Sequence, residues 1–161
     1  MSLPALNVIL DSIQAAEGGY WNDPIGGPTN FGITQTTLDK LRSQYDGLLP
    51  DSVDDLDKET ARIILRSEYL EKTRVIELPY PLNLFHGHMA VMSWDDGIRI
   101  MQKRLGVPVD GVIGPVTLRA VRAESPLDKL YGLYSDVKRF IETRNNGFND
   151  SYARRFNQIQ L

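Results

Sequence analysis

Three side chains near the start of the chain have the types and the spacing that acid–base chemistry requires. Glu17 precedes two glycines, Asp23 follows six residues later, and Thr29 follows after six more. One carboxyl group could donate a proton, a second acid could activate or order a water molecule, and a hydroxyl could position that water. Enzymes that cleave glycosidic bonds with water use such a pair of acids.

The spacing of these residues also has a plainer interpretation. Acidic residues six positions apart are common by chance, and an acid beside two glycines can serve only as a solvated group at a helix end. Two physical effects favour a proton donor at Glu17. Partial burial and the negative end of a helix both raise the pKa of a carboxyl group. A general acid must keep its proton near neutral pH.

The elements around these residues are readable from the pattern. Apolar residues recur at three- and four-residue spacing over residues 5–16, so we predict an amphipathic helix that Gly18 and Gly19 end. No helical period continues over residues 20–33, where glycine, proline and asparagine predict turns and a short two- or three-stranded β-hairpin. Thr34 is then predicted to cap a second helix with Leu38, Leu41 and Tyr45 on one apolar face.

The rest of the chain is predicted to be helical. Apolar periods and helix-start signals predict further helices that begin near Asp57, Pro81, Ser93, Pro115 and Pro126, with a short last helix around Tyr152. Tyr69 is an expected inward residue of the helix after Asp57, and Gly106 is expected to end the helix that begins near Ser93. The predicted fold class is therefore mainly α, an α+β arrangement in which one irregular hairpin at about residues 20–33 interrupts a helical domain.

Composition excludes several classes of protein. A chain of 161 residues with 42% hydrophobic and 24% charged residues is typical of one soluble globular domain. A net charge of -3 argues against nucleic acid as a partner. The chain has no cysteine, and we expect neither a metal nor a cofactor. No apolar run is long enough for stable membrane insertion, and no signal peptide is recognised.

Further side chains could contact a substrate. Aromatic residues of the hairpin could stack on sugar rings, although they can equally pack only against the loop itself. His86 and His88 are two residues apart, so on a helix they face different directions and could not share a metal. His86 remains a candidate for lining a cleft. The candidate substrate-binding residues are Tyr20, Trp21, Asn30, Phe31, Thr34 and His86.

The hairpin segment also resembles a known family. E-G-G-Y-x-N-D-P followed by G-G-P-T-N-F-G-I-T, between Glu17 and Thr34, is similar to the signature of glycoside hydrolase family 108, the peptidoglycan N-acetylmuramidases of phages and bacteria. The resemblance implies a lysozyme-like fold with Glu17 as the catalytic acid. By analogy with the broader phage lysozymes, Asp23 and Thr29 would assist it.

A second motif resembles the same family. M-Q-K-R-L-G-V-P-V-D-G-V-I-G-P-V-T-L, from Met101 to Leu118, is similar to its peptidoglycan-binding region. We therefore expect a single compact domain over residues 1–161, with a catalytic muramidase part over 1–92 and a peptidoglycan-binding helical part over 93–161. The chain departs from the family in a shortened loop after Asp23 and in the residues around His86.

The resemblance implies that the substrate is bacterial peptidoglycan and that the bond cleaved is the β-1,4 bond between N-acetylmuramic acid and N-acetylglucosamine. A catalytically inactive peptidoglycan-binding module and a lytic transglycosylase are the alternatives. We expect a monomer that is made in the cytoplasm of a bacterium or a phage-infected host. A holin or an export system would release it to the cell wall, as for a phage endolysin or a secretion-associated muramidase.

Overall fold

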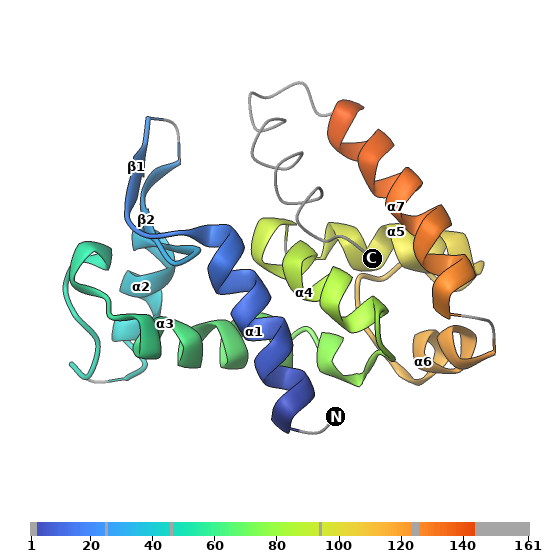
Figure 1. Ribbon diagram of the computed structural model, residues 1–161, viewed down its shortest axis with the longest axis horizontal. Helices are drawn as coiled ribbons and strands as arrows, with labels where there is room; N and C mark the ends of the chain where they lie inside the picture. The colour runs from blue at the N-terminus through green and yellow to red at the C-terminus, as the bar shows by residue number, and fades with distance from the viewer. Residues whose placement is uncertain (1–2, 25, 46, 94, 124–125, 144–161) are drawn as a thin grey trace.

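The structure is a computed structural model that describes residues 3–24, 26–45, 47–93, 95–123 and 126–143. A small antiparallel sheet with strand order β1-β2-β3 lies at one end of a helical molecule (Figure 1). The predicted mainly α fold with a short hairpin is therefore confirmed. None of the described helices is long and apolar enough to cross a bilayer.

The elements follow in this order: α1 (Leu3–Glu17), β1 (Trp21–Asp23), β2 (Gly27–Asn30), β3 (Ile33–Thr34), α2 (Gln35–Arg42), η1 (Val53–Asp55), α3 (Lys58–Ile64), η2 (Leu65–Glu71), η3 (Val75–Glu77), α4 (Leu82–Ser93), α5 (Asp96–Leu105), α6 (Pro115–Arg122) and α7 (Pro126–Thr143). Figure 1 shows the sheet with α2 and α3 at one end, and α5, α6 and α7 at the other. Helices α1 and α4 lie between these two groups.

Helix α1 leads directly into the sheet. Its apolar stripe of Leu6, Ile9, Leu10 and Ile13 is buried. The helix ends at Gly18, whose φ of 69° is the left-handed conformation that glycine adopts most easily. Strand β1 then pairs with β2, and β2 pairs with β3. The predicted helix end and the predicted hairpin are both confirmed.

Helix α2 begins as predicted but is shorter. The Thr34 hydroxyl accepts a hydrogen bond from the Thr37 backbone N–H at 3.1 Å, which is the expected N-cap. The apolar period predicted that Tyr45 would share the inward face of this helix. That prediction is wrong, because α2 ends at Arg42 and Tyr45 is 43% exposed.

Helix α3 starts at its predicted cap and then changes geometry. Asp57 accepts hydrogen bonds from the backbone and the hydroxyl of Thr60, and these bonds lower the pKa of its carboxyl group. After Ile64 the backbone widens into the π-helix η2. Three consecutive residues of η2 are buried, from Glu68 to Leu70. π-Turns inside α-helices occur frequently at functional sites.

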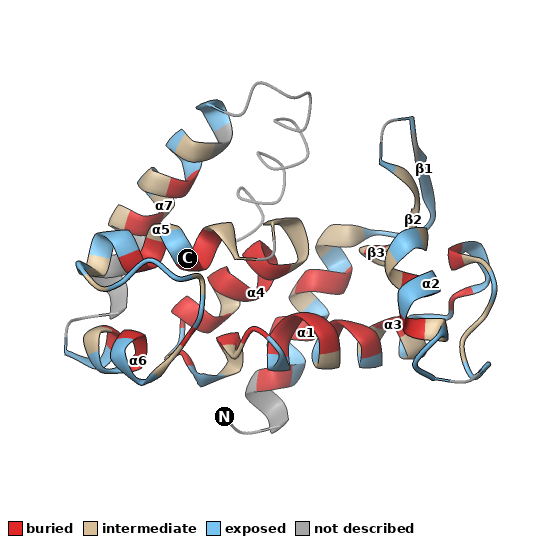
Figure 2. Cartoon of the chain, turned by 180° about the vertical axis from the view of Figure 1, so that it is seen from behind, coloured by how far each residue is buried: buried red, intermediate tan, exposed pale blue. Residues whose placement is uncertain are grey.

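Helix α4 forms the centre of the core. Almost every residue from Leu82 to Ala90 is buried, and Figure 2 shows the buried residues concentrated along α4 and the inner side of α1. Gly87 lets the two helices approach closely, because a Cβ atom there would lie 2.8 Å from Cγ2 of Ile9. The sheet is thus joined through α1 to the most buried helix of the molecule.

Helix α5 starts later than predicted. Ser93 was expected to cap it, but α4 continues through Ser93, whose hydroxyl donates to the Met89 carbonyl four residues back at 3.3 Å. The N-cap of α5 is Asp95. Gly106, with φ 66°, ends the helix, and Pro115 starts α6, both as predicted.

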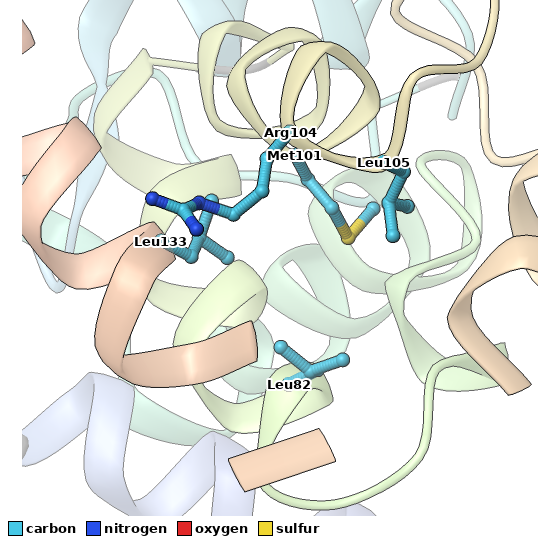
Figure 3. A pocket seen from close by; sticks show the side chains of 5 residues that line it. All are labelled: Leu82, Met101, Arg104, Leu105 and Leu133. Carbon is cyan, nitrogen blue, oxygen red and sulfur yellow. The ribbon is translucent and has the colours of Figure 1, made fainter. Parts of the chain in front are cut away.

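Helix α7 packs against α5. Asp136 of α7 accepts a hydrogen bond from Arg104 Nε at 2.7 Å. A small hollow remains between α4, α5 and α7, and Figure 3 shows the side chains that line it. They are Leu82, Met101, Arg104, Leu105 and Leu133. The short last helix predicted around Tyr152 lies outside the described residues.

Candidate active site

Glu17 is the last residue of α1, and its carboxyl group lies against the turn between β2 and β3. A Cβ atom placed on Gly32 would stand 2.8 Å from Cδ of Glu17 and 3.0 Å from its Oε2. The turn is built from two left-handed residues, Phe31 with φ 49° and Gly32 with φ 81°. The sheet therefore brings a residue without a side chain against the half-buried carboxyl group.

A row of hydroxyl groups begins two residues beyond Gly32. The Thr34 hydroxyl donates to Oγ1 of Thr37 at 3.0 Å, and Oγ1 of Thr37 lies 3.5 Å from the hydroxyl of Tyr69. These residues come from the start of α2 and from η2. The row thus connects the end of β3 with the π-helix.

The ring of Tyr69 is buried, with 8% of the residue exposed. Burial raises the pKa of Tyr69, the hydrogen bond with Thr37 acts in the opposite direction, and the negative charges of Glu17 and Glu68 raise it further. Both carboxylates therefore lie near this hydroxyl. The sequence pattern identified Tyr69 only as an inward residue of a helix, and no local signal marked Thr37. Gly32 belongs to the signature between Glu17 and Thr34, but the pattern did not show its contact with Glu17.

Two exposed aromatic residues, Tyr20 and Trp21, follow Glu17 after two glycines, and Trp21 is the first residue of β1. Tyr20 is 48% exposed and Trp21 is 64% exposed, whereas Phe31 packs partly against the core. Thr29 lies opposite Trp21 in the sheet and donates its hydroxyl proton to the Trp21 carbonyl at 3.3 Å. The Thr29 hydroxyl, which was predicted to position water, thus also links β2 to β1.

Asp23 is the last residue of β1, and its backbone pairs with Gly27. The side chain of Asp23 lies outside the described part of the structure. Its role as a second acid stays a prediction.

The structure gives Asn30 a different role from the predicted one. The residue is 5% exposed, and its side-chain amide donates to the Val53 carbonyl at 2.7 Å and to the Leu56 carbonyl at 3.3 Å. Asn30 therefore attaches the sheet to η1. It is not placed to bind a polymer at the surface.

The prediction that His86 lines a cleft is also wrong. The residue is 1% exposed, and its ring packs edge-on against the ring of Phe85, with 5.3 Å between the two ring centroids. Burial lowers the pKa of His86 to about 3, so its ring is neutral. His88 lies elsewhere in the core, where its Nε2 is 2.9 Å from the Ser12 hydroxyl. Over the described ranges, no three His, Asp or Glu side chains gather as metal ligands do.

The second sequence motif folds around one buried amide. Gln102 is fully buried, and its Nε2 lies within hydrogen-bond distance of Asp110 Oδ1 at 2.6 Å, the Val112 carbonyl at 3.0 Å and Thr117 Oγ1 at 3.1 Å. Its Oε1 accepts from the Gly111 N–H at 2.8 Å. The polar residues of the motif therefore hold the loop between α5 and α6.

Comparison with known proteins agrees with this geometry. The profile of the family described as Glycosyl hydrolase 108 matches residues 10–93, more than half of the chain, a range that includes Glu17 and the whole sheet. The solved structure of SagA from Brucella abortus is similar with a TM-score of 0.82 and 26% identity, over 98% of this chain and 92% of that chain. No curated protein matches the sequence. The family match ends at the end of α4, before the Gln102 loop.

Proposed function

Because the chain belongs to the glycosyl hydrolase 108 family, we propose that it hydrolyses the β-1,4 bond between N-acetylmuramic acid and N-acetylglucosamine. Membership makes the chain a glycoside hydrolase and implies bacterial peptidoglycan as its substrate class. The bond and the acting residue are our proposal. It depends above all on the Glu17 carboxyl group at the end of α1, which packs against Gly32 within the matched segment.

The proposed reaction starts at Glu17. The protonated carboxyl group gives its proton to the glycosidic oxygen as the bond between this oxygen and the anomeric carbon breaks. Water supplies the new bond to the sugar and loses a proton to a base. Asp23 on β1 is the proposed base or electrostatic partner. Thr29 has directed its own proton to Trp21, so its oxygen can accept a hydrogen bond from that water.

The exposed aromatic residues are the proposed sugar contacts. Tyr20 and Trp21 follow Glu17 after two glycines and are both largely exposed, so a sugar ring can stack on them. Phe31 belongs to the turn beside Gly32 and Thr34 caps the helix that follows, and both are further proposed substrate contacts.

We further propose that the part of the chain after α4 contacts the cell wall. The loop held by Gln102 and the start of α6 present three exposed valines, Val109, Val112 and Val116. Such apolar side chains suit the faces of sugar rings and the stem peptides of the wall. The protein would act as a monomer after a holin or an export system has released it from the cytoplasm.

The products of purified peptidoglycan test this function. After complete digestion, mass spectrometry of the fragments is expected to show reducing N-acetylmuramic acid ends. Reducing N-acetylglucosamine ends would contradict the proposed bond. 1,6-Anhydro ends would identify a lytic transglycosylase instead. Sedimentation with peptidoglycan without any released fragment would favour the inactive binding module.

A further inference from the structure

We propose that Tyr69 is a positioning residue for Glu17, whose carboxylate accepts a hydrogen bond from the Tyr69 hydroxyl. The inference rests on the proposed role of Glu17 as general acid. It assigns a function to the π-helix η2, which the family resemblance and the candidate site residues leave unexplained.

The side chain of Tyr69 is buried next to the hydroxyl row. The residue is 8% exposed and lies on η2, and a buried hydroxyl almost always has hydrogen-bond partners. One neighbour is Oγ1 of Thr37, at 3.5 Å. This distance is long for a hydrogen bond between hydroxyls, so the contact with Thr37 is weak and serves to orient Tyr69.

The hydrogen bonds of the hydroxyl row run in one direction, from Thr34 toward Tyr69. Each hydroxyl carries one proton. Thr34 accepts from the Thr37 N–H and gives its own proton to Oγ1 of Thr37. Thr37 can then direct its proton to the oxygen of Tyr69, which agrees with the lowering effect of this bond on the pKa of Tyr69. In this arrangement the proton of Tyr69 points away from Thr37.

Two carboxylates are candidate acceptors for the Tyr69 proton. The carboxylates near Tyr69 are those of Glu17 and Glu68, because the negative charge of each acts on the phenol. Glu68 already forms an ion pair with Lys72 one turn further along the helix. Glu17 lies against Gly32, two residues before the Thr34 that begins the hydroxyl row. Glu17 is therefore the better placed acceptor.

The proposed hydrogen bond from Tyr69 would make Glu17 a stronger acid. When Glu17 gives its proton to the substrate, its carboxylate becomes negative, and a donor held in place stabilises this charge. The high pKa of the buried phenol keeps the donor protonated throughout. Removal of the donor should raise the pKa of Glu17, because hydrogen bonds to a carboxylate favour its charged form.

The direct test is a titration of Glu17 that does not depend on activity. The protein is labelled with carbon-13 at the glutamate side-chain carboxyl groups, and the Glu17 signal is assigned by its loss in Glu17→Gln. We expect Tyr69→Phe to raise the pKa of Glu17 by about half a unit or more. Tyr45→Phe is the matched control, because Tyr45 is exposed, and it should leave the titration unchanged.

Thr37→Val provides a second variant. It should raise the pKa of Glu17 in the same direction by a smaller amount, since it removes the group that orients Tyr69. If Tyr69→Phe does not fold, this variant carries the test. An unchanged Glu17 titration in a folded Tyr69→Phe, or in Thr37→Val where Tyr69→Phe does not fold, overturns the inference.

Wall cleavage separates this inference from the proposed function. In Tyr69→Phe the rate should fall by about tenfold and the alkaline limb of the pH–rate profile should move to higher pH, as expected for a weaker acid. A structural role alone would not move this limb. If Glu17→Gln cleaves peptidoglycan like the wild type, the proposed function fails. If Glu17→Gln is inactive and the profiles of Tyr69→Phe and Tyr45→Phe coincide, only the role of Tyr69 fails.

Discussion

The Glu17 carboxyl group packs directly against Gly32, so that any side chain at position 32 would enter the space of the carboxyl group. The contact joins the end of α1 to the turn between β2 and β3. It explains why an irregular segment rich in glycine lies beside the proposed acid, and it makes the geometry of Glu17 dependent on one residue of the turn.

Gly32→Ala should therefore reduce activity strongly. The new methyl group would lie 2.8 Å from Cγ and Cδ of Glu17, and the left-handed φ of 81° would add about 1 kcal/mol of backbone strain. We expect wall cleavage to fall by roughly 100-fold, because a small displacement of a catalytic group has effects of this size. Release of soluble fragments from peptidoglycan measures this change.

Gly27→Ala is the matched control for this variant. Gly27 has a φ of 78°, but no atom lies within 4 Å of the position of its Cβ. Both substitutions should lower the melting temperature by similar amounts, since both place alanine in the left-handed region. Equal losses of activity in the two variants would show that the contact with Glu17 does not matter.

His86 should make the stability of the protein depend on pH. The pKa of its ring is about 3 in the folded protein and about 6.5 when unfolded, so the unfolded chain binds the proton more tightly. The contribution of neutral His86 to the free energy of unfolding is complete above about pH 6.5 and is lost as the pH falls from there toward 3. Between these two pKa values, the free energy of unfolding changes with pH by up to about 1.4 kcal/mol per pH unit because of His86.

Urea unfolding at several pH values between 7 and 4 measures this effect. His86→Leu cannot titrate, and its free energy of unfolding should decline less steeply with acid than that of the wild type. Carboxyl groups titrate in both proteins, so the difference between the two slopes reports on His86. Parallel curves would mean that the ring is not buried in neutral form.

Gln102→Leu should destabilise the loop between α5 and α6. The substitution removes the amide that meets Asp110, Val112 and Thr117 and that accepts from Gly111. Loss of a buried network of this kind costs about 2–4 kcal/mol of unfolding free energy. Denaturant unfolding measures it. The neighbouring Lys103→Ala, on the exposed side of α5, should change stability by less than about 0.5 kcal/mol. A similarly small change in Gln102→Leu would contradict this account of the motif.

Local chemistry explains which parts of the fold were predictable. Glycines in left-handed conformations end α1 and α5, and side-chain caps begin α2 and α3, and each of these signals acts within about four residues. The π-turn of η2 was not predictable, because inward residues at three- and four-residue spacing continue through it. Ser93 shows the same limit, since a serine that can cap one helix can also bond back within another.

The site was predictable only in part, because a motif does not show where a polar side chain points. Asn30 lies within the family signature, yet its amide bonds to carbonyls more than twenty residues away. His86 is a polar residue of α4, but its side chain is buried in the core. Thr37 and Tyr69 meet across 32 positions of the sequence. Such contacts depend on tertiary packing and leave no local pattern.

The role of Glu17 as proton donor is tested by the rate at which Glu17→Gln releases soluble fragments from purified peptidoglycan. Glutamine keeps the size of the side chain but cannot donate an acid proton. Glu142→Gln, on the exposed side of α7, is the control. We expect a roughly 10²–10⁴-fold loss of rate for Glu17→Gln with an unchanged melting temperature, and wild-type rates for Glu142→Gln. A Glu17→Gln variant that cleaves the wall as fast as the wild type would contradict this role.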